Sequence, residues 1–313
     1  VPWDQGQTHV MSHTLHYGTG VFEGIKCYAT DYGPAIFRLQ DHIRRLLQSA
    51  DIYEMDTPYD MDGIIQGCIE LVRVTRIESG YIRPIIYFGY DSLGIHPKNC
   101  PVNIAIGVFN WGTYLGEGAL ENGVRVTISP WRKFHSSSFP TTAKANGQYL
   151  NSVLAVRDAK EKGFDEALLL NQDGTIAEGA GQNLFVINND TLYTNAEESS
   201  ILMGITRDTV IQLARQKGYK VKIAPLSLGQ LFTANEVFFT GTASEITPVS
   251  SIDRRKVNHG KPGKITKQLQ ENYLDVVHGK VPELFHYLTL VKDTTLRSLN
   301  TEPLQGQPSA FIT

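Results

Sequence analysis

Apolar residues recur at helical spacing over several stretches of the chain. The clearest stretch is 60–76, in which the apolar positions fall on one helical stripe, made up of Ile64, Ile65, Cys68, Leu71 and Val72. A second stripe predicts a helix over 41–51, with Asp41 as its cap. Further helices are predicted over 149–162, 207–217 and 264–277, and a glycine that can end a helix follows each of the first two.

Other apolar runs are rich in β-branched and aromatic residues and are bounded by glycine or proline. They predict strands at 81–90, 103–111, 123–129 and 236–241. From 166 to 194, two turn sequences separate apolar runs, which predicts a strand meander. Because strands and helices mix without a regular alternation, the pattern favours an α+β fold over a doubly wound parallel sheet.

A glycine-rich stretch divides the chain. With 313 residues, the chain is about twice the length of a typical domain. The stretch 110–123 carries four glycines and little periodicity, which is typical of a linker. We therefore expect an N-terminal domain over 1–111, an interdomain loop over 112–122, a C-terminal domain over 123–297 and a loose tail over 298–313.

Composition limits the classes of function. A net charge of −3 argues against binding to nucleic acid or anionic membranes through bulk positive charge. The cysteines, Cys27, Cys68 and Cys100, are odd in number and widely spaced, which favours a reducing compartment over a disulfide scaffold. The chain contains no apolar run of about 18 residues. We expect a cytoplasmic protein, and leave open both import into an organelle and a removed N-terminal segment.

Lys144 is the first candidate for chemistry. It lies between Ala143 and Ala145, just before the helix predicted from Tyr149. A lysine in a cleft with a lowered pKa can act as an amine nucleophile. Taken by itself, the stretch fits a solvated loop lysine better than a nucleophile.

Glycine-rich and helix-start segments supply further candidates. Glu178 precedes two glycines that allow a close backbone approach, although a simple hairpin has the same pattern. The segment 202–208 leads into a helix, where backbone N–H groups can bind a phosphate, or where Thr206 can act as an ordinary cap. The loop 239–245 offers N–H donors to an anion in the same way, or it simply turns.

Charged residues in the first half complete the set. Arg83 lies within a predicted strand, which makes it a better candidate than Arg45 for a buried carboxylate partner. His13 and His16 have a spacing at which zinc ligands occur, with His9 nearby. No carboxylate or cysteine completes a ligand set at a recognisable spacing, so we expect no metal.

Together these segments form a known order of motifs. They are HYGTGVFEGI (16–25), HIRRLLQSA (42–50), YIRP (81–84), TAKANGQYLNS (142–152), EGAGQNLF (178–185), LMGITRD (202–208) and FFTGTASEITPV (238–249). From about Thr8 to about Val277 the chain resembles the branched-chain amino-acid aminotransferases, pyridoxal-phosphate enzymes of fold type IV. The resemblance implies a smaller α/β N-terminal domain and a larger pseudo-barrel C-terminal domain.

The resemblance implies pyridoxal 5′-phosphate (PLP) as the cofactor. Lys144 would carry it as a Schiff base and would then move the proton during transfer. Glu178 would pair with the pyridinium nitrogen, and Tyr149 would hydrogen-bond the phenolate oxygen. The other residues that would contact the cofactor are Arg45, Leu202, Gly204, Ile205, Thr206, Gly241 and Thr242.

The implied reaction is a ping-pong transamination. Amino groups would pass between leucine, isoleucine or valine and 2-oxoglutarate, which gives branched 2-oxo acids and L-glutamate. The loop of Thr242 and Ala243 would receive the α-carboxylate, and Arg83, with Tyr81 nearby, would bind the distal carboxylate of glutamate. The remaining substrate residues would be Phe22, Gly24, Tyr114 and, from a second subunit, Tyr17. A homo-oligomer, a dimer or a hexamer, is therefore expected, with no nucleic-acid or membrane partner.

Several positions depart from the usual family pattern. Gln182 stands where the family usually has Glu, and Met203 where Pro is frequent. Asn146 and Gln148 also differ, and a first strand expected before Val1 is absent. Two other functions stay open: a D-amino-acid or (R)-amine transaminase of the same fold, and a catalytically silent binding protein.

Overall fold

The chain folds into two units, each described here by itself. The computed structural model describes residues 1–112, 114–292 and 310–312. Over these residues, unit 1 comprises 1–112, 143–147, 275–292 and 310–312, and unit 2 comprises 114–142 and 148–274. These units differ from the two continuous domains that the sequence predicts, because a five-residue segment and the C-terminal part of the chain group with unit 1. The expected interdomain loop also contains a short helix, α4 (Ala119–Asn122).

Unit 1 contains a sheet that, over the described residues, has seven strands. The path runs β15-β3-β2-β4-β5-β16, and β1 pairs with β4. The strands are β1 (Gly20–Phe22), β2 (Ile25–Thr30), β3 (Gly33–Phe37), β4 (Gly80–Phe88), β5 (Val102–Phe109), β15 (Leu288–Leu290) and β16 (Ala310–Ile312). Tyr81 and Arg83 are two residues apart on β4, so their side chains point to the same face of the sheet.

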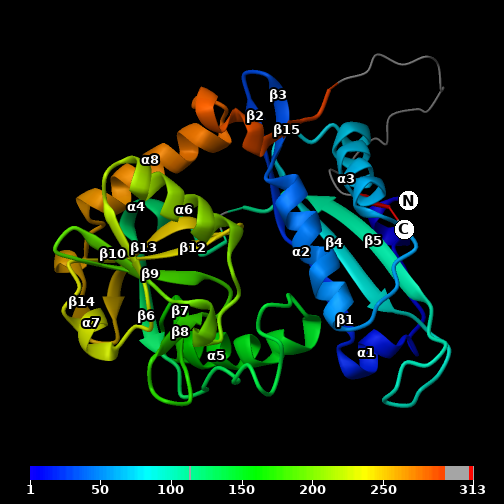
Figure 1. Ribbon diagram of the computed structural model, residues 1–313, viewed down its shortest axis with the longest axis horizontal. Coiled ribbons are helices and arrows are strands. Elements are labelled where there is room, and N and C mark those ends of the chain that lie inside the picture. The colour runs from blue at the N-terminus through cyan, green and yellow to red at the C-terminus, as the bar shows by residue number, and fades with distance from the viewer. Residues whose placement is uncertain (113, 293–309, 313) are drawn as a thin grey trace. The chain divides into compact units, whose positions relative to one another are not determined.

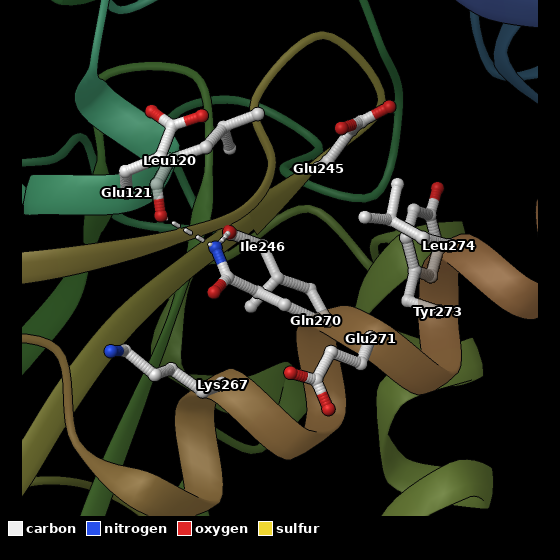
Figure 2. A pocket seen from close by; sticks show the side chains of 9 residues that line it. All are labelled: Leu120, Glu121, Glu245, Ile246, Lys267, Gln270, Glu271, Tyr273 and Leu274. Carbon is white, nitrogen blue, oxygen red and sulfur yellow. Dashed lines mark hydrogen bonds between the residues drawn. The ribbon is translucent and has the colours of Figure 1, made fainter.

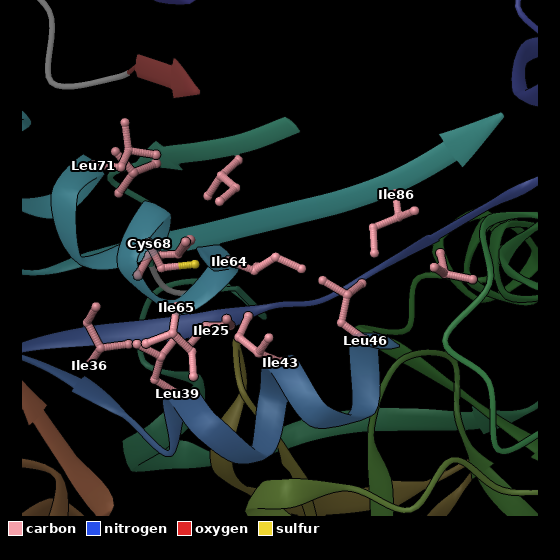
Figure 3. Packing of buried hydrophobic residues seen from close by; sticks show 14 of the residues in the cluster. Ile25, Ile36, Leu39, Ile43, Leu46, Ile64, Ile65, Cys68, Leu71 and Ile86 are labelled. Carbon is pink, nitrogen blue, oxygen red and sulfur yellow. The ribbon is translucent and has the colours of Figure 1, made fainter. Parts of the chain in front are cut away.

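Two helices pack on this sheet and enclose its core. They are α2 (Leu39–Ile52) and α3 (Met61–Thr75), and a short helix α1 (His13–Tyr17) precedes β1 (Figure 1). Figure 3 shows how their apolar stripes meet the strands; the fully or almost fully buried residues include Ile25, Ile36, Leu39, Ile43, Leu46, Ile64 and Ile86. The prediction of α3 is confirmed, and the Asp60 carboxylate caps it by accepting from the Gly63 N–H at 2.8 Å.

Unit 2 contains a curled sheet of nine strands over its described residues. The path runs β11-β10-β9-β12-β13-β6-β7-β8, and β14 pairs with β13. The strands are β6 (Val124–Ile128), β7 (Glu166–Leu170), β8 (Ile176–Gly179), β9 (Asn183–Asn188), β10 (Thr191–Thr194), β11 (Lys220–Ile223), β12 (Glu236–Gly241), β13 (Glu245–Ile252) and β14 (Arg255–Lys256). Apart from α4, the helices are α5 (Tyr149–Glu161), α6 (Ile205–Gln216), α7 (Leu228–Phe232) and α8 (Lys264–Val277), the last of which continues into unit 1.

The strands expected to form one meander instead form two separate hairpins. Strands β7 and β8 pair at one end of the sheet, and β9 and β10 pair towards the other. The chain turns sharply after β8, where the Gly179 N–H donates to the Gln182 carbonyl at 2.8 Å. After that turn β9 pairs with β12.

One further expectation was wrong, and another falls mostly outside the described residues. Asp41 does not cap α2, because the helix begins at Leu39 and the Asp41 carboxylate instead accepts from Arg38 Nε and Arg44 Nη1, both at 2.7 Å. The loose tail expected at 298–313 lies mostly outside the described residues. Its residues 310–312 form β16, which pairs antiparallel with the edge of β5 and so satisfies backbone groups there.

Candidate active site

The backbone of Lys144 is fixed although the residue lies outside regular structure. Its N–H donates to Ser49 Oγ on α2 at 3.1 Å, and its carbonyl accepts from the Phe22 N–H at 3.0 Å. The next residue, Ala145, forms an isolated bridge with Val21 of β1. Through these contacts the segment 143–147 becomes part of unit 1.

The side chain of Lys144 has the properties of an amine nucleophile. Its Nζ lies 4.9 Å from the centre of the Phe22 ring. Burial lowers the pKa of Lys144 to about 8; the carboxylate of Glu23 raises that pKa, while the guanidinium groups of Arg45 and Arg83 lower it further. A large fraction of the amine is therefore neutral near pH 8, unlike that of a solvated loop lysine.

Glu23, which the sequence reasoning missed, is the anion of this cluster. Its carboxylate is fully buried and accepts from Arg45 Nε at 2.6 Å, Arg45 Nη2 at 2.9 Å and His42 Nδ1 at 2.7 Å. The Arg45 and His42 contacts hold the pKa of Glu23 far below its usual range, against the effect of burial. Burial lowers the pKa of His42, so the ring is neutral and donates through Nδ1. A signal existed in the sequence: Glu23 interrupts an apolar run from Val21 to Ile25.

Arg83 lies among three aromatic rings. Its guanidinium carbon is 4.8 Å from the centre of Phe22, 5.2 Å from that of Tyr81 and 5.8 Å from that of Trp111, which the sequence reasoning also missed. Its Nε is buried and has no hydrogen-bond partner. A buried donor left unpaired is costly, so this guanidinium is suited to bind an anion.

Gly24 allows the Tyr81 side chain to lie against the backbone. A Cβ atom built on Gly24 would lie 1.7 Å from the Tyr81 hydroxyl oxygen, which no side chain permits. Only glycine is therefore compatible with this position of Tyr81. The structure thus brings Phe22, Gly24, Tyr81, Arg83 and Lys144 together within unit 1.

Tyr17 and the histidines have other partners. The Tyr17 side chain is exposed, and its hydroxyl donates to the Leu93 carbonyl at 2.8 Å, so its role in a second subunit stays a prediction. Both ring nitrogens of His13 form hydrogen bonds, with Thr19 and with the Gly94 carbonyl. No group of three or more metal-binding side chains is found within the described ranges.

In unit 2, Glu178 is the centre of a second polar cluster. Its carboxylate accepts from Lys133 Nζ at 2.7 Å, Asn183 Nδ2 at 3.0 Å and the Leu202 N–H at 3.3 Å. The Lys133–Glu178 pair is largely buried. Nothing in the sequence pattern singled out Lys133, because it lies in an irregular loop after β6.

Asn183 connects this carboxylate to the start of α6. Besides Glu178, its amide donates to the Leu202 carbonyl at 2.8 Å, and a Cβ on Gly204 would lie 2.0 Å from Asn183 Oδ1. Gly204 is also the N-cap of α6, which places Ile205 and Thr206 in the first turn. Thr206 is therefore not the cap, and its N–H belongs to the helix end that can bind an anion.

The loop between β12 and β13 carries unsatisfied hydroxyl groups. Thr240 Oγ1 and Ser244 Oγ, which flank Gly241, Thr242 and Ala243, are buried without a hydrogen-bond partner. The loop approaches the Glu178 segment, since a Cβ on Gly241 would lie 3.5 Å from the Gly181 carbonyl oxygen. Such a loop is suited to accept a carboxylate or phosphate.

Three other residues from the sequence analysis are in the following positions. A Cβ on Gly181 would lie 3.7 Å from the Tyr114 hydroxyl oxygen. Tyr149 is the first residue of α5 and is partly buried. Gln182 donates through Nε2 to the buried Glu166 carboxylate at 2.9 Å, and burial raises the pKa of Glu166.

A separate cavity in unit 2 does not contain the predicted residues. It has a volume of about 320 Å³ and lies between α4, β13 and α8 (Figure 2). Its lining combines Leu120, Ile246, Tyr273 and Leu274 with the charged Glu121, Glu245, Lys267 and Glu271, and Gln270 donates across it to the Leu120 and Ile246 carbonyls.

No described helix is long and apolar enough to cross a membrane.

Comparison with known proteins identifies similar chains. The model of the amino-transferase class IV family matches residues 20–252. The branched-chain-amino-acid aminotransferase of Pseudomonas aeruginosa is 42% identical over 292 residues, which cover 93% of this chain and 95% of the relative. The crystal structure of the Escherichia coli branched-chain amino acid aminotransferase is 41% identical with a TM-score of 0.91, covering 93% and 96% of the two chains. That of the branched-chain amino acid aminotransferase from Thermobaculum terrenum, in its PLP-form (holo-form), is 35% identical with a TM-score of 0.86, covering 93% and 95%.

Proposed function

This chain belongs to the class IV aminotransferase family, among its branched-chain aminotransferases, and we propose that it transfers amino groups between leucine, isoleucine or valine and 2-oxoglutarate. One observation carries the proposal. Lys144 Nζ and the Arg83 guanidinium lie at similar distances from the same Phe22 ring, 4.9 and 4.8 Å from its centre. An amine nucleophile and an anion-binding group therefore both lie next to the same aromatic ring.

The cofactor is pyridoxal 5′-phosphate. When bound, it supplies an aldehyde to which an amine attaches and a ring that accepts electrons from the substrate Cα. The residues present fit this group. Lys144 has a partly neutral amine, Glu178 is a buried carboxylate suited to a ring nitrogen, and the first turn of α6 offers N–H groups to a phosphate. Arg45 is proposed as a further phosphate ligand.

Lys144 has two tasks in this proposal. Its neutral amine would hold the cofactor through the aldehyde, with loss of water, and once substrate has displaced it, Nζ would take the proton from the substrate Cα and return it during transfer. Its lowered pKa makes both tasks possible near neutral pH. The exchange happens once for each substrate, so the two substrates bind in turn and the kinetics are ping-pong.

Arg83 is proposed to select the acidic substrate. Its unpaired Nε gains a partner when the distal carboxylate of glutamate or 2-oxoglutarate binds. The Phe22, Tyr81 and Trp111 rings around it accept an aliphatic side chain when leucine, isoleucine or valine binds instead. The acidic and the aliphatic substrate would then bind against the same three rings, one in each half of the reaction. Tyr114, and Tyr17 from a second subunit of a homo-oligomer, are proposed to complete the apolar pocket.

Absorption spectroscopy tests this function. The full chain with pyridoxal 5′-phosphate should show a visible band that bleaches with L-leucine and returns with 2-oxoglutarate, and Lys144→Ala should lose it. Arg83→Met should slow the 2-oxoglutarate step by about tenfold or more, because a charge-assisted hydrogen bond is lost, and leave the leucine step within about threefold. Activity with D-alanine and none with L-leucine would instead identify the other transaminase of this fold. Equal loss of both steps in Arg83→Met would contradict the role of Arg83.

A further inference from the structure

Both carboxylate oxygens of Glu23 are hydrogen-bonded within the protein. Its two oxygens accept four hydrogen bonds: two from Arg45, one from His42 Nδ1, and one from the Gly24 N–H at 3.2 Å. Oε2 accepts three of these bonds and Oε1 accepts one, so both oxygens are engaged by the protein itself. The side chain is also fully buried. Glu23 therefore acts through its neighbours.

The contact between Glu23 and Arg45 fixes the plane of the guanidinium. Arg45 donates through both Nε and Nη2, one to each carboxylate oxygen, which is the bidentate arrangement that sets direction as well as distance. Arg45 lies on α2 and Glu23 directly follows β1, so the pair links two elements far apart in sequence. A long, flexible arginine side chain thereby loses its rotational freedom before any ligand arrives.

The same network reaches the backbone of Lys144. Ser49, one helical turn after Arg45, donates through Oγ to the Arg45 carbonyl at 2.8 Å and accepts from the Lys144 N–H. The charged or titratable groups near Lys144 are Glu23 after β1, Arg45 and His42 on α2, and Tyr81 and Arg83 on β4. Of these, Glu23 is the carboxylate that opposes the positive charges.

We infer that Glu23 is a positioning residue for cofactor binding: its bidentate contact holds Arg45 in the orientation that receives the cofactor phosphate, and its charge offsets the cations around Lys144. This inference rests on the proposed function, in which Arg45 is a phosphate ligand. If Glu23 has this role, replacing it should weaken binding of the cofactor's phosphate group in particular. Replacing a purely structural carboxylate would have no such selective effect.

The test compares pyridoxal 5′-phosphate with pyridoxal, which lacks the phosphate. In the full chain, Glu23→Gln should weaken binding of the phosphorylated form by about tenfold or more and that of pyridoxal by less than about threefold. The matched control is Asp41→Asn on α2, which removes an acceptor for Arg38, just before the helix, and for Arg44 on it; it should change neither affinity. The pH at which Lys144 reacts with pyridoxal should also fall in Glu23→Gln and not in the control.

Additional variants separate the explanations. If Glu23 acts through Arg45, Glu23→Gln added to Arg45→Met should not lower the affinity ratio of the two ligands any further. Should Glu23→Gln fail to fold, Glu23→Asp keeps the charge but withdraws the carboxylate, and the ratio should still fall. An unchanged ratio in a folded Glu23 variant, or an equal loss for both ligands, overturns the inference. Wild-type chain that binds both ligands equally would instead overturn the proposed role of Arg45.

Discussion

Lys144 shows how surroundings determine the behaviour of a single residue. Nothing in its local sequence distinguishes it from a loop lysine, and the groups that lower its pKa come from α2 and β4. Its function therefore depends on contacts between residues about a hundred positions apart. The order of motifs along the chain predicted a catalytic role for Lys144, but only the folded chain shows that Glu23 and His42 lie near it.

The charge of Lys144 should affect stability in a way that depends on pH. Without cofactor, the folded state binds the Lys144 proton less tightly than the unfolded state, because the pKa falls from 10.5 to about 8 on folding. Below pH 8 both states are protonated and the cost of burying the charge is present; from pH 8 to 10.5 that cost disappears. Lys144→Met should therefore unfold with a free energy about 3 kcal/mol higher at pH 7, and this gain should vanish near pH 10.5.

Denaturant titration of cofactor-free protein at both pH values measures this difference. Lys162→Met is a matched control, because that lysine is exposed and forms only a surface pair with Asp158. It should change stability little at either pH. A gain for Lys144→Met that is the same at both pH values would show that the packing of the methionine, and not the lost charge, is responsible.

At the scale of elements, helix ends depend on distant side chains. Helix α8 begins at Lys264, and the Glu236 carboxylate, from the first residue of β12, accepts from the Ile265 N–H at 3.1 Å, the Thr266 N–H at 2.8 Å and Thr266 Oγ1 at 2.7 Å. The carboxylate supplies acceptors that the first turn lacks and a favourable charge at the positive end of the helix.

Glu236→Ala should lower the free energy of unfolding by about 1–3 kcal/mol, because buried N–H groups at the start of α8 lose their acceptor. Urea unfolding followed by circular dichroism measures the change. Glu271→Ala is the control on α8 itself: its side chain is exposed, so the effect should stay within about 0.5 kcal/mol. If the two variants have equal stability, Glu236 does not cap the helix.

Elements with a local signal were predictable from the sequence. Helix α8 and strand β12 have the predicted bounds, and α3 differs by one residue at each end, because periodicity and turn residues mark them locally. The start of α2 was not predictable, since Arg38 adopts a left-handed backbone conformation, with a φ of 51°, and engages Asp41. The pairing of β9 with β12 was likewise set by long-range contacts.

At the scale of the whole molecule, the division into two units was the least predictable feature. One change of unit follows Gly112, within the glycine-rich stretch. Residues 143–147 join unit 1 through hydrogen bonds to Ser49 and Phe22. The composition of the surrounding chain gives no sign of these long-range contacts. The five residues that contain Lys144 therefore belong to a different unit from the chain on either side of them.

The core of unit 1 contains all three cysteines as free thiols. Burial raises the pKa of Cys27 and of Cys68 to about 12, and the thiolate is the reactive form. Native protein should therefore leave both unmodified by an aromatic disulfide reagent at pH 7.5, and all three should react after unfolding. Cys100→Ser should show no fast thiol in the native state. A fast-reacting thiol in that variant would show that the core of unit 1 opens readily.

The place of β15 in the sheet has a consequence for synthesis of the chain. β15 covers the edge of β3 with the register Leu288↔Phe37, so partners on neighbouring strands are separated by most of the polypeptide. At about 5–20 residues per second, a ribosome needs roughly 13–50 seconds to advance from the first strand to the second. For that interval the nascent chain presents an uncovered strand edge, on which chaperones or neighbouring nascent chains can pair. Messages truncated before the codon for Leu288 would leave this edge uncovered permanently.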